Sequence, residues 1–171
     1  FFGLDGQRLQ CDNWTATVVR MKGYDVLFIS VYMQTGVGPQ GINLHRMAQI
    51  AALVNTMAIE FVIAGDWNMT PDELRTSDFD QCISGTIVEP EDAEFTCAQG
   101  GRTIDYCIVS RSLAGSFRLE VDKGAPWSPH VGLVGRLQAQ HKEKWIIVQE
   151  KAAELTQCHG PRLHPWEYYS D

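Results

Sequence analysis

Oxygen-bearing side chains follow directly after a short apolar run near residue 65. The run Phe61–Ala64 is closed by Gly65, and Asp66 and Asn68 come next. A continuous apolar run of this length is typical of a strand buried on both faces, and α/β proteins usually build their sites at the carboxyl ends of strands. A carboxylate and an amide suit Mg²⁺, which prefers oxygen ligands. The alternative is that both side chains only cap the following turn.

A second aspartate and a histidine could form a proton-transfer pair. Asp105 stands near the start of the apolar segment Thr103–Val109, and His130 lies in a loop before the last apolar segment. A carboxylate that accepts a hydrogen bond from an imidazole fixes its tautomer and raises its basicity, so that the histidine can take a proton from an attacking water. A lone histidine in a loop is also often structural, and both interpretations stay open on these residues alone.

Strands whose ends meet are needed to position these residues. Thr15–Met21 is rich in β-branched residues, and a turn-forming Lys-Gly-Tyr-Asp separates it from the apolar run Val26–Tyr32, which predicts a β-hairpin. Apolar residues then recur at helical spacing from Ile42 to Met57, which predicts a helix of about four turns. Pro71, followed by two acidic residues, predicts a short capped helix. Further strands are expected at Phe61–Ala64, ending just before Asp66, and at Thr103–Val109, Phe117–Val121 and Val131–Leu137.

The order of these segments carries a family resemblance. It resembles the ordered motifs of the endonuclease/exonuclease/phosphatase superfamily, through Ile63–Asn68, Phe95–Cys97, Thr103–Ser110 and Ser128–His130, over the span from Thr15 to Leu137. In that family two facing β-sheets are flanked by helices, and a divalent-metal site cleaves phosphodiester or phosphomonoester bonds with an activated water. The resemblance therefore implies an α/β fold, a two-sheet β-sandwich flanked by helices that is incomplete at its N-terminus.

The resemblance also implies a role for each candidate site residue. Asp66 and Asn68 would orient the attacking water and the phosphate, and Asp66 would bind Mg²⁺. Asp105 would orient His130, which would contact the phosphate or act as the base. Tyr32 matches the family's phosphate-side tyrosine.

Two departures from the family's motifs bear on activity. The family's metal-binding glutamate lies on a strand before the first hairpin, and nothing before Cys11 resembles that motif. Pro129 stands where the family usually has an aspartate, and its side chain cannot bind a metal. We therefore predict a Mg²⁺-dependent phosphodiesterase or endonuclease-like domain that is weak, inactive, or completed by amino-terminal residues absent from this sequence. The alternative is a non-catalytic structural subunit of a larger protein assembly, which would need no cofactor.

Composition and charge limit the expected partners. A chain of 171 residues with 44% hydrophobic content fits one soluble globular domain. A net charge of −7 opposes general attraction to nucleic acid, so a phosphate ester, possibly nucleic acid, is expected only as a substrate of the site.

The apolar segments are shorter than the roughly 20 residues that span a bilayer, so no transmembrane segment is expected. No targeting segment opens the chain, and the compartment is not predicted. Five cysteines without CxxC spacing favour reduced, mostly buried thiols.

The composition changes near residue 138, which predicts a body over residues 1–137 and an extension over residues 138–171. Trp145–Val148 and the apolar residues after Lys151 could form an amphipathic helix, and the prolines and aromatics that follow are typical of a tail. We expect this tail either to dock on a protein partner or to fold back over the sheet edge left by the missing strands. Protein partners would bind through the tail and the exposed sheet edge.

Overall fold

The computed structural model describes residues 13–21, 23–122, 124–126 and 128–138. The helix and tail expected between residues 139 and 171 therefore lie outside the described residues. Within the described part of the chain, no helix is long and apolar enough to cross a membrane. The elements are, in chain order, β1 (Trp14–Met21), β2 (Tyr24–Tyr32), α1 (Gly41–Met57), β3 (Glu60–Asp66), α2 (Pro71–Arg75), α3 (Phe79–Cys82), β4 (Gly85–Val88), β5 (Asp105–Ser110), the 3-10 turn η1 (Ala114–Ser116), β6 (Phe117–Asp122) and β7 (Gly132–Leu137).

Five strands form the larger sheet, in the order β1-β2-β3-β5-β4. The predicted hairpin is confirmed, because β1 pairs antiparallel with β2 along its whole length, from Trp14↔Val31 to Met21↔Tyr24. The chain then crosses through α1 to β3, which runs parallel to β2, as two parallel strands require a long connection. β5 lies antiparallel to β3. β4 pairs antiparallel with β5 and forms the edge of the sheet opposite β1. β6 and β7 pair antiparallel in a separate two-stranded sheet.

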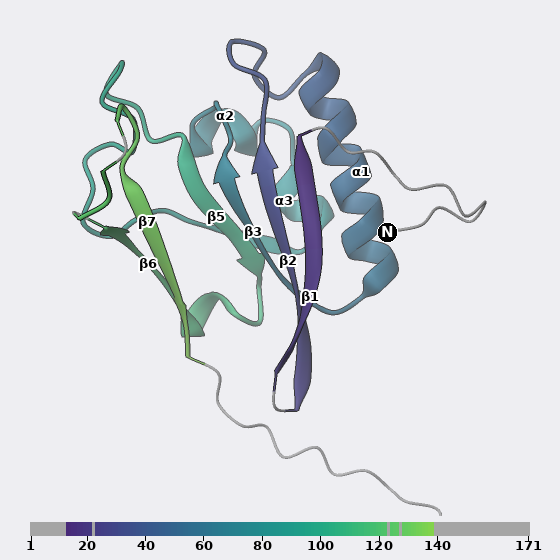
Figure 1. Ribbon diagram of the computed structural model, residues 1–171. Coiled ribbons are helices and arrows are strands. Elements are labelled where there is room, and N and C mark those ends of the chain that lie inside the picture. The colour runs from purple at the N-terminus through teal and green to yellow at the C-terminus, as the bar shows by residue number, and fades with distance from the viewer. Residues whose placement is uncertain (1–12, 22, 123, 127, 139–171) are drawn as a thin grey trace, which may run out of the picture.

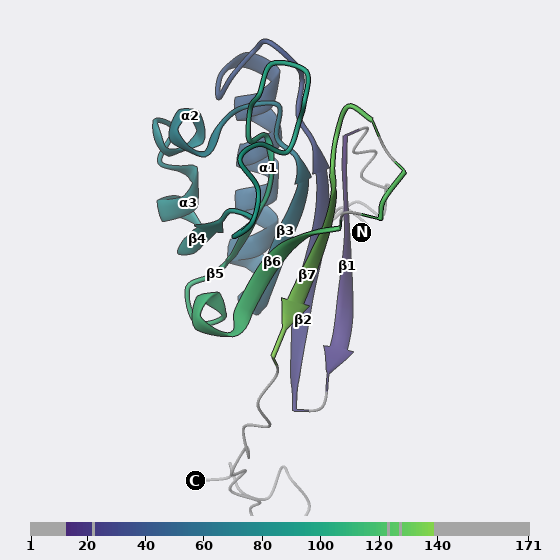
Figure 2. The same cartoon turned by 90° about the vertical axis from the view of Figure 1, so that its left-hand side faces the viewer.

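The two faces of the larger sheet are covered differently, as Figures 1 and 2 show. The helices cover one face, where Ile29 and Ile63 of the sheet belong to the same apolar cluster as Ile50 of α1 and Leu74 of α2. The β6–β7 sheet covers the other face, where a second cluster is formed by side chains that include Val26, Val62, Val109, Phe117 and Leu119. The expected two-sheet sandwich flanked by helices is therefore present, and the described residues contribute two strands to its second sheet.

Local sequence explains the two longer helix assignments. The buried residues of α1 include Met47, Ile50 and Val54, whose spacing places them on one side of the helix. α2 begins at a capping box: the Thr70 side chain accepts from the Glu73 backbone N–H, and the Glu73 carboxylate accepts from the Thr70 N–H. This supports the short capped helix that the sequence predicts after residue 70.

The structure differs from the sequence-based prediction in several places. β2 begins at Tyr24, inside the predicted turn, and β5 begins at Asp105, two residues after the predicted start at Thr103. β3 does not end before Asp66, because Asp66 still pairs with Tyr32 on one side and Asp105 on the other. α3 and β4 lie where the sequence indicates only loops after the capped helix; both are four residues long, too short for a periodic pattern. Cys97 and Cys107 are buried as predicted, whereas Cys82 is exposed.

Candidate active site

Asp66 is held at the last position of β3 by the geometry of the residue before it. Gly65 has φ +152, and a Cβ atom there would come within 2.0 Å of the Val31 carbonyl oxygen on β2, so only glycine fits. After Asp66 the chain turns, and the Asn68 backbone N–H donates to Asp66 Oδ1 at 2.9 Å. The carboxylate is therefore fixed at the carboxyl end of β3, where the sequence predicts a site.

Strand pairing brings the second carboxylate to the same place. Asp105, the first residue of β5, is the register partner of Asp66, and register partners project from the same face of a sheet. The backbone N–H groups of Ile104 and Asp105 both donate to the buried Thr96 hydroxyl, each at 2.9 Å. Thr96 therefore positions the start of β5, a function that its place in the sequence motif Phe95–Cys97 did not reveal.

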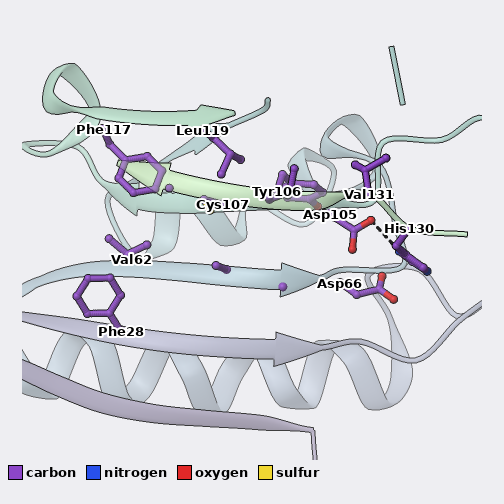
Figure 3. Close-up of a pocket in the computed structure, with 14 residues that line it drawn as sticks. Phe28, Val62, Asp66, Asp105, Tyr106, Cys107, Phe117, Leu119, His130 and Val131 are labelled. Carbon is purple, nitrogen blue, oxygen red and sulfur yellow. Dashed lines mark hydrogen bonds and ion pairs between the residues drawn. The ribbon is translucent and has the colours of Figure 1, made fainter. Parts of the chain in front are cut away.

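His130 reaches the carboxylates from the loop before β7. Backbone bonds fix that loop to the segment around residue 97: Val131 N–H donates to Thr96 O, and Ala98 N–H donates to Pro129 O, both at 2.9 Å. His130 Nδ1 lies 2.9 Å from Asp105 Oδ2, within hydrogen-bond distance, as Figure 3 shows. The predicted contact between Asp105 and His130 is therefore present, and with Asp105 ionised Nδ1 is the donor.

Asp66, Asp105 and His130 form one cluster, defined by one ligand atom from each lying within 4.8 Å of the others. Burial raises the pKa of the Asp66 carboxyl, and the nearby Asp105 charge adds to that rise; the Asn68 N–H bond and His130 act in the opposite direction. The hydrogen bond to Asp105 raises the pKa of His130, with burial opposing it. Asp66 and His130 therefore each titrate under the influence of their neighbours in the cluster.

Tyr32 and Asn68 lie beside this cluster, with their side chains engaged differently. Tyr32 is the register partner of Asp66 on β2, and its side chain is 52% exposed. Asn68 has φ 52, its Nδ2 donates to Met33 O and its Oδ1 accepts from the Thr35 hydroxyl, both at 2.9 Å. The Asn68 amide therefore links the end of β3 to residues 33–35, which follow β2, through two hydrogen bonds.

A cavity of about 460 Å³ lies between the two sheets, with the cluster at one end. Asp66, Asp105 and His130 lie together at the right of Figure 3, away from Phe28, Val62 and Phe117 at its left. The remaining lining of the cavity is mostly apolar and includes Phe28, Val62, Cys107, Phe117, Leu119 and Leu133. Burial raises the pKa of the Cys107 thiol to about 12, so this lining cysteine stays protonated at neutral pH.

The Asp105 bond makes a prediction for the titration of His130. NMR titration of the histidine ring in metal-free protein is expected to give a pKa above the ordinary value near 6.5. The sign follows because Asp105 stabilises the protonated ring: the added stability is present at low pH and is lost as pH rises through the raised pKa. Asp105→Asn is expected to lower this pKa. An equal or higher value in that variant would contradict the geometry.

Comparison with known proteins gives matches only at the level of structure. No family model and no curated protein sequence matches the chain. The endonuclease domain of TRAS1, a telomere-specific non-LTR retrotransposon, superimposes with TM-score 0.61 at 16% identity, covering 75% of this chain and 65% of that domain. The Haemophilus ducreyi cytolethal distending toxin gives TM-score 0.53 at 16% identity, covering 78% and 56%. The Staphylococcus aureus beta toxin gives TM-score 0.52 at 15% identity, covering 74% and 57%.

These structures define the fold class. The chain shares the α/β sandwich fold of these three structures, which is the fold class that its sequence motifs predict. It spans less than two thirds of the length of each of the three matched proteins, at 65%, 56% and 57%. At these identities the likeness establishes the fold alone.

Proposed function

We propose that this chain hydrolyses phosphate esters slowly, with the help of a divalent cation. The observation that carries the proposal is the convergence of Asp66, Asp105 and His130 at one end of a cavity, from two strands and a loop. Two carboxylates beside an oriented imidazole are the groups that activation of a water next to a phosphate requires. The fold class supports the same chemistry.

His130 is the general base in this proposal. Because Nδ1 faces Asp105 Oδ2, the other ring nitrogen, Nε2, is left to accept a proton from water. Asp105 keeps the ring in that tautomer and stabilises the imidazolium that forms. The ring is 35% exposed, so water can reach it without a conformational change.

The donor set fits a hard cation such as Mg²⁺. Asp66 Oδ1 accepts a backbone bond and Asp105 Oδ2 faces His130, and each carboxylate has further lone pairs that could bind a cation. Mg²⁺ is commonly held by one or two carboxylates together with water and substrate phosphate. Asp66 would hold it, with Asp105 beside it, and Mg²⁺ bound there would stabilise the charge on the phosphoryl oxygens. Because Pro129 supplies no third carboxylate, weak binding and slow turnover are expected.

Metal dependence tests the proposal. Full-length protein is assayed with an abasic-site duplex and with bis(p-nitrophenyl) phosphate while Mg²⁺ or Mn²⁺ is titrated. Turnover is expected only with metal and is expected to stop when EDTA removes it. Asp66→Asn is expected to lower turnover by about tenfold or more, and to raise the metal concentration needed for half-maximal rate, because it removes one of two charged ligands.

Asp25→Asn is the matched control for this experiment. Asp25 lies at the opposite end of β2 from the cluster, where it pairs with exposed Arg20 at 3.3 Å. This variant is expected to keep the metal response of the unmodified chain. Turnover that ignores metal, or that Asp66→Asn leaves unchanged, would count against the proposal.

A second candidate function is that of a non-catalytic structural subunit. Pro129 at the site and the small second sheet favour it, because a two-stranded sheet leaves a strand edge on which a protein partner could dock. Absence of turnover at every metal concentration, in protein whose thermal unfolding is cooperative, would favour this candidate over hydrolysis. Co-purification of a partner that is lost on substitution at that edge would support it directly.

A further inference from the structure

Three polar residues are buried among those that the structure describes: Asn43, Thr96 and Ser110. Buried polar groups are normally hydrogen-bonded, so the partners of each side chain show what it holds in place. Asn43 lies on α1, and Ser110 lies at the end of β5 farthest from the cluster. Thr96 differs from both, because its partners include Asp105, a member of the cluster.

The Thr96 hydroxyl fixes the start of β5 through two successive backbone groups. It accepts from the N–H groups of Ile104 and Asp105, each at 2.9 Å. A hydroxyl oxygen has two lone pairs, so both are engaged. Because Asp105 is the first residue of β5, its backbone cannot move without losing one of these bonds. The hydroxyl therefore also sets the direction in which the Asp105 carboxylate projects.

The same hydroxyl reaches Asp66 through one intermediate residue. The Ile104 carbonyl accepts from the Trp67 N–H at 2.8 Å, so Ile104 is bonded to Thr96 on one side and to the residue after Asp66 on the other. This bond continues the β3–β5 ladder beyond the register pair of Asp66 and Asp105. The end of β3 and the start of β5 are therefore held at a fixed spacing.

The Thr96 backbone carbonyl holds the third member of the cluster. It accepts from the Val131 N–H at 2.9 Å, and Val131 directly follows His130. Cys97, the residue after Thr96, forms a β-bridge with His130 itself. One residue therefore holds Asp105 through its side chain and the His130 loop through its backbone, and the two side chains meet at 2.9 Å (Figure 3).

We propose that Thr96 is a positioning residue that sets the contact between Asp105 and His130 by holding the backbone of both partners. Its effect on turnover rests on the proposed hydrolysis, whereas its effect on the contact does not. Threonine suits this position because its β-branched side chain has few rotamers, which keeps the hydroxyl directed at the two N–H groups. Thr96 is fully buried, so it acts on a substrate only through Asp105 and His130.

The tautomer of His130 tests this role without any need for turnover. The ¹⁵N chemical shifts of the ring, measured on the full chain without metal and above the pKa of the imidazole, show which ring nitrogen carries the proton. In the unmodified chain the proton is expected on Nδ1, where Asp105 accepts it. Thr96→Val is close in shape but accepts no hydrogen bond. In this variant the ring is expected to lose its preference and to populate the Nε2–H tautomer.

Two further variants separate positioning from a general loss of stability. Thr96→Ser keeps the hydroxyl and is expected to keep the Nδ1–H tautomer. Ser110→Ala is the matched control, because the buried Ser110 hydroxyl accepts from Phe61 N–H at 2.6 Å and donates to Phe61 O at 3.2 Å, at the other end of β5. This control is expected to lower the temperature of thermal unfolding, as Thr96→Val does, and to leave the tautomer unchanged.

Steady-state rates give a second readout if the chain hydrolyses phosphate esters. Thr96→Val is expected to lower kcat by about 10- to 100-fold, because a displaced base costs rate although every reacting group is still present. Thr96→Ser and Ser110→Ala are expected to keep the unmodified rate. Absence of turnover in the unmodified chain would count against the proposed hydrolysis alone, since the tautomer measurement still decides the role of Thr96.

Three results would overturn the proposal. The first is an unchanged Nδ1–H tautomer in folded Thr96→Val, and the second is an equal loss of that tautomer in Ser110→Ala. The third needs no substitution, and it decides the matter if Thr96→Val does not fold. The amides of Ile104 and Asp105 are expected to exchange slowly with solvent in the unmodified chain, and fast exchange at both would show that the hydroxyl does not hold them.

Discussion

Replacing His130 by alanine is expected to lower kcat for phosphoester hydrolysis by about 10²–10⁴-fold, the usual contribution of a positioned general base. The effect should fall on kcat because the imidazole acts on the attacking water while the carboxylates stay in place. The acid limb of the pH–rate profile should disappear in the variant, since the titrating group of that limb is the imidazole whose pKa Asp105 raises. Steady-state rates at saturating metal and substrate measure both effects.

His45→Ala is the control for the loss of a histidine. His45 lies on α1, where its ring Nε2 is 3.2 Å from the Gln49 amide, and it takes no part in the Asp66–Asp105–His130 cluster. The control is expected to retain the unmodified rate. If His130→Ala keeps more than about a tenth of the activity while remaining folded, His130 is not the base and the water is activated by another group.

Much of the fold can be predicted from the sequence because its longer elements carry strong local patterns. The hairpin of β1 and β2, the amphipathic α1 and the apolar β3 are each long enough for their periodicity to identify them. β4 cannot be predicted in this way. It has only four residues, and its pairing with β5 depends on residues about twenty positions further along the chain.

The site could be predicted in part, and its geometry required the fold. The types of Asp66, Asp105 and His130 suggest acid–base and metal chemistry, but the chain separates the first two by 39 positions. Only the antiparallel register of β3 and β5 makes them neighbours. Thr96 was missed as a positioning residue because a buried threonine that accepts two backbone N–H groups has no local sequence pattern.

Two residues illustrate how a family motif can differ from local structure. Asn68 stands at a motif position linked with phosphate and water, yet its amide hydrogen-bonds Met33 O and the Thr35 hydroxyl. Pro129 stands where the motif that this sequence resembles has an aspartate, and its carbonyl accepts from Ala98 N–H, which holds the His130 loop in place. The backbone at this position therefore holds His130 in place without a carboxylate side chain, and the metal titration measures how much activity the site has without it.

Trp67→Ala is expected to produce the largest loss of stability, about 3–5 kcal/mol in the free energy of unfolding. Trp67 follows the cluster residue Asp66 in the chain, and its side chain is fully buried. Its ring stacks on Tyr106 at a centroid distance of 5.5 Å and contacts Phe79 at 6.0 Å. Alanine removes these contacts and leaves a cavity that the strands on either side cannot close without moving. Thermal unfolding is expected to occur roughly 6–20 °C lower, as this loss implies for a chain of this size.

Trp67→Phe separates packing from hydrogen bonding at the same position. The Trp67 indole N–H donates to Tyr106 O at 3.1 Å, a bond that phenylalanine cannot make. This variant keeps most of the ring contacts, so its loss should be smaller, about 1–3 kcal/mol, from the unpaired carbonyl and the smaller ring. Because Trp67 joins β3 to β5, both variants should also shift the Asp66 and Asp105 resonances in NMR spectra. Equal stability of Trp67→Ala and the unmodified chain would mean that the stacked core beneath the site does not hold these strands together.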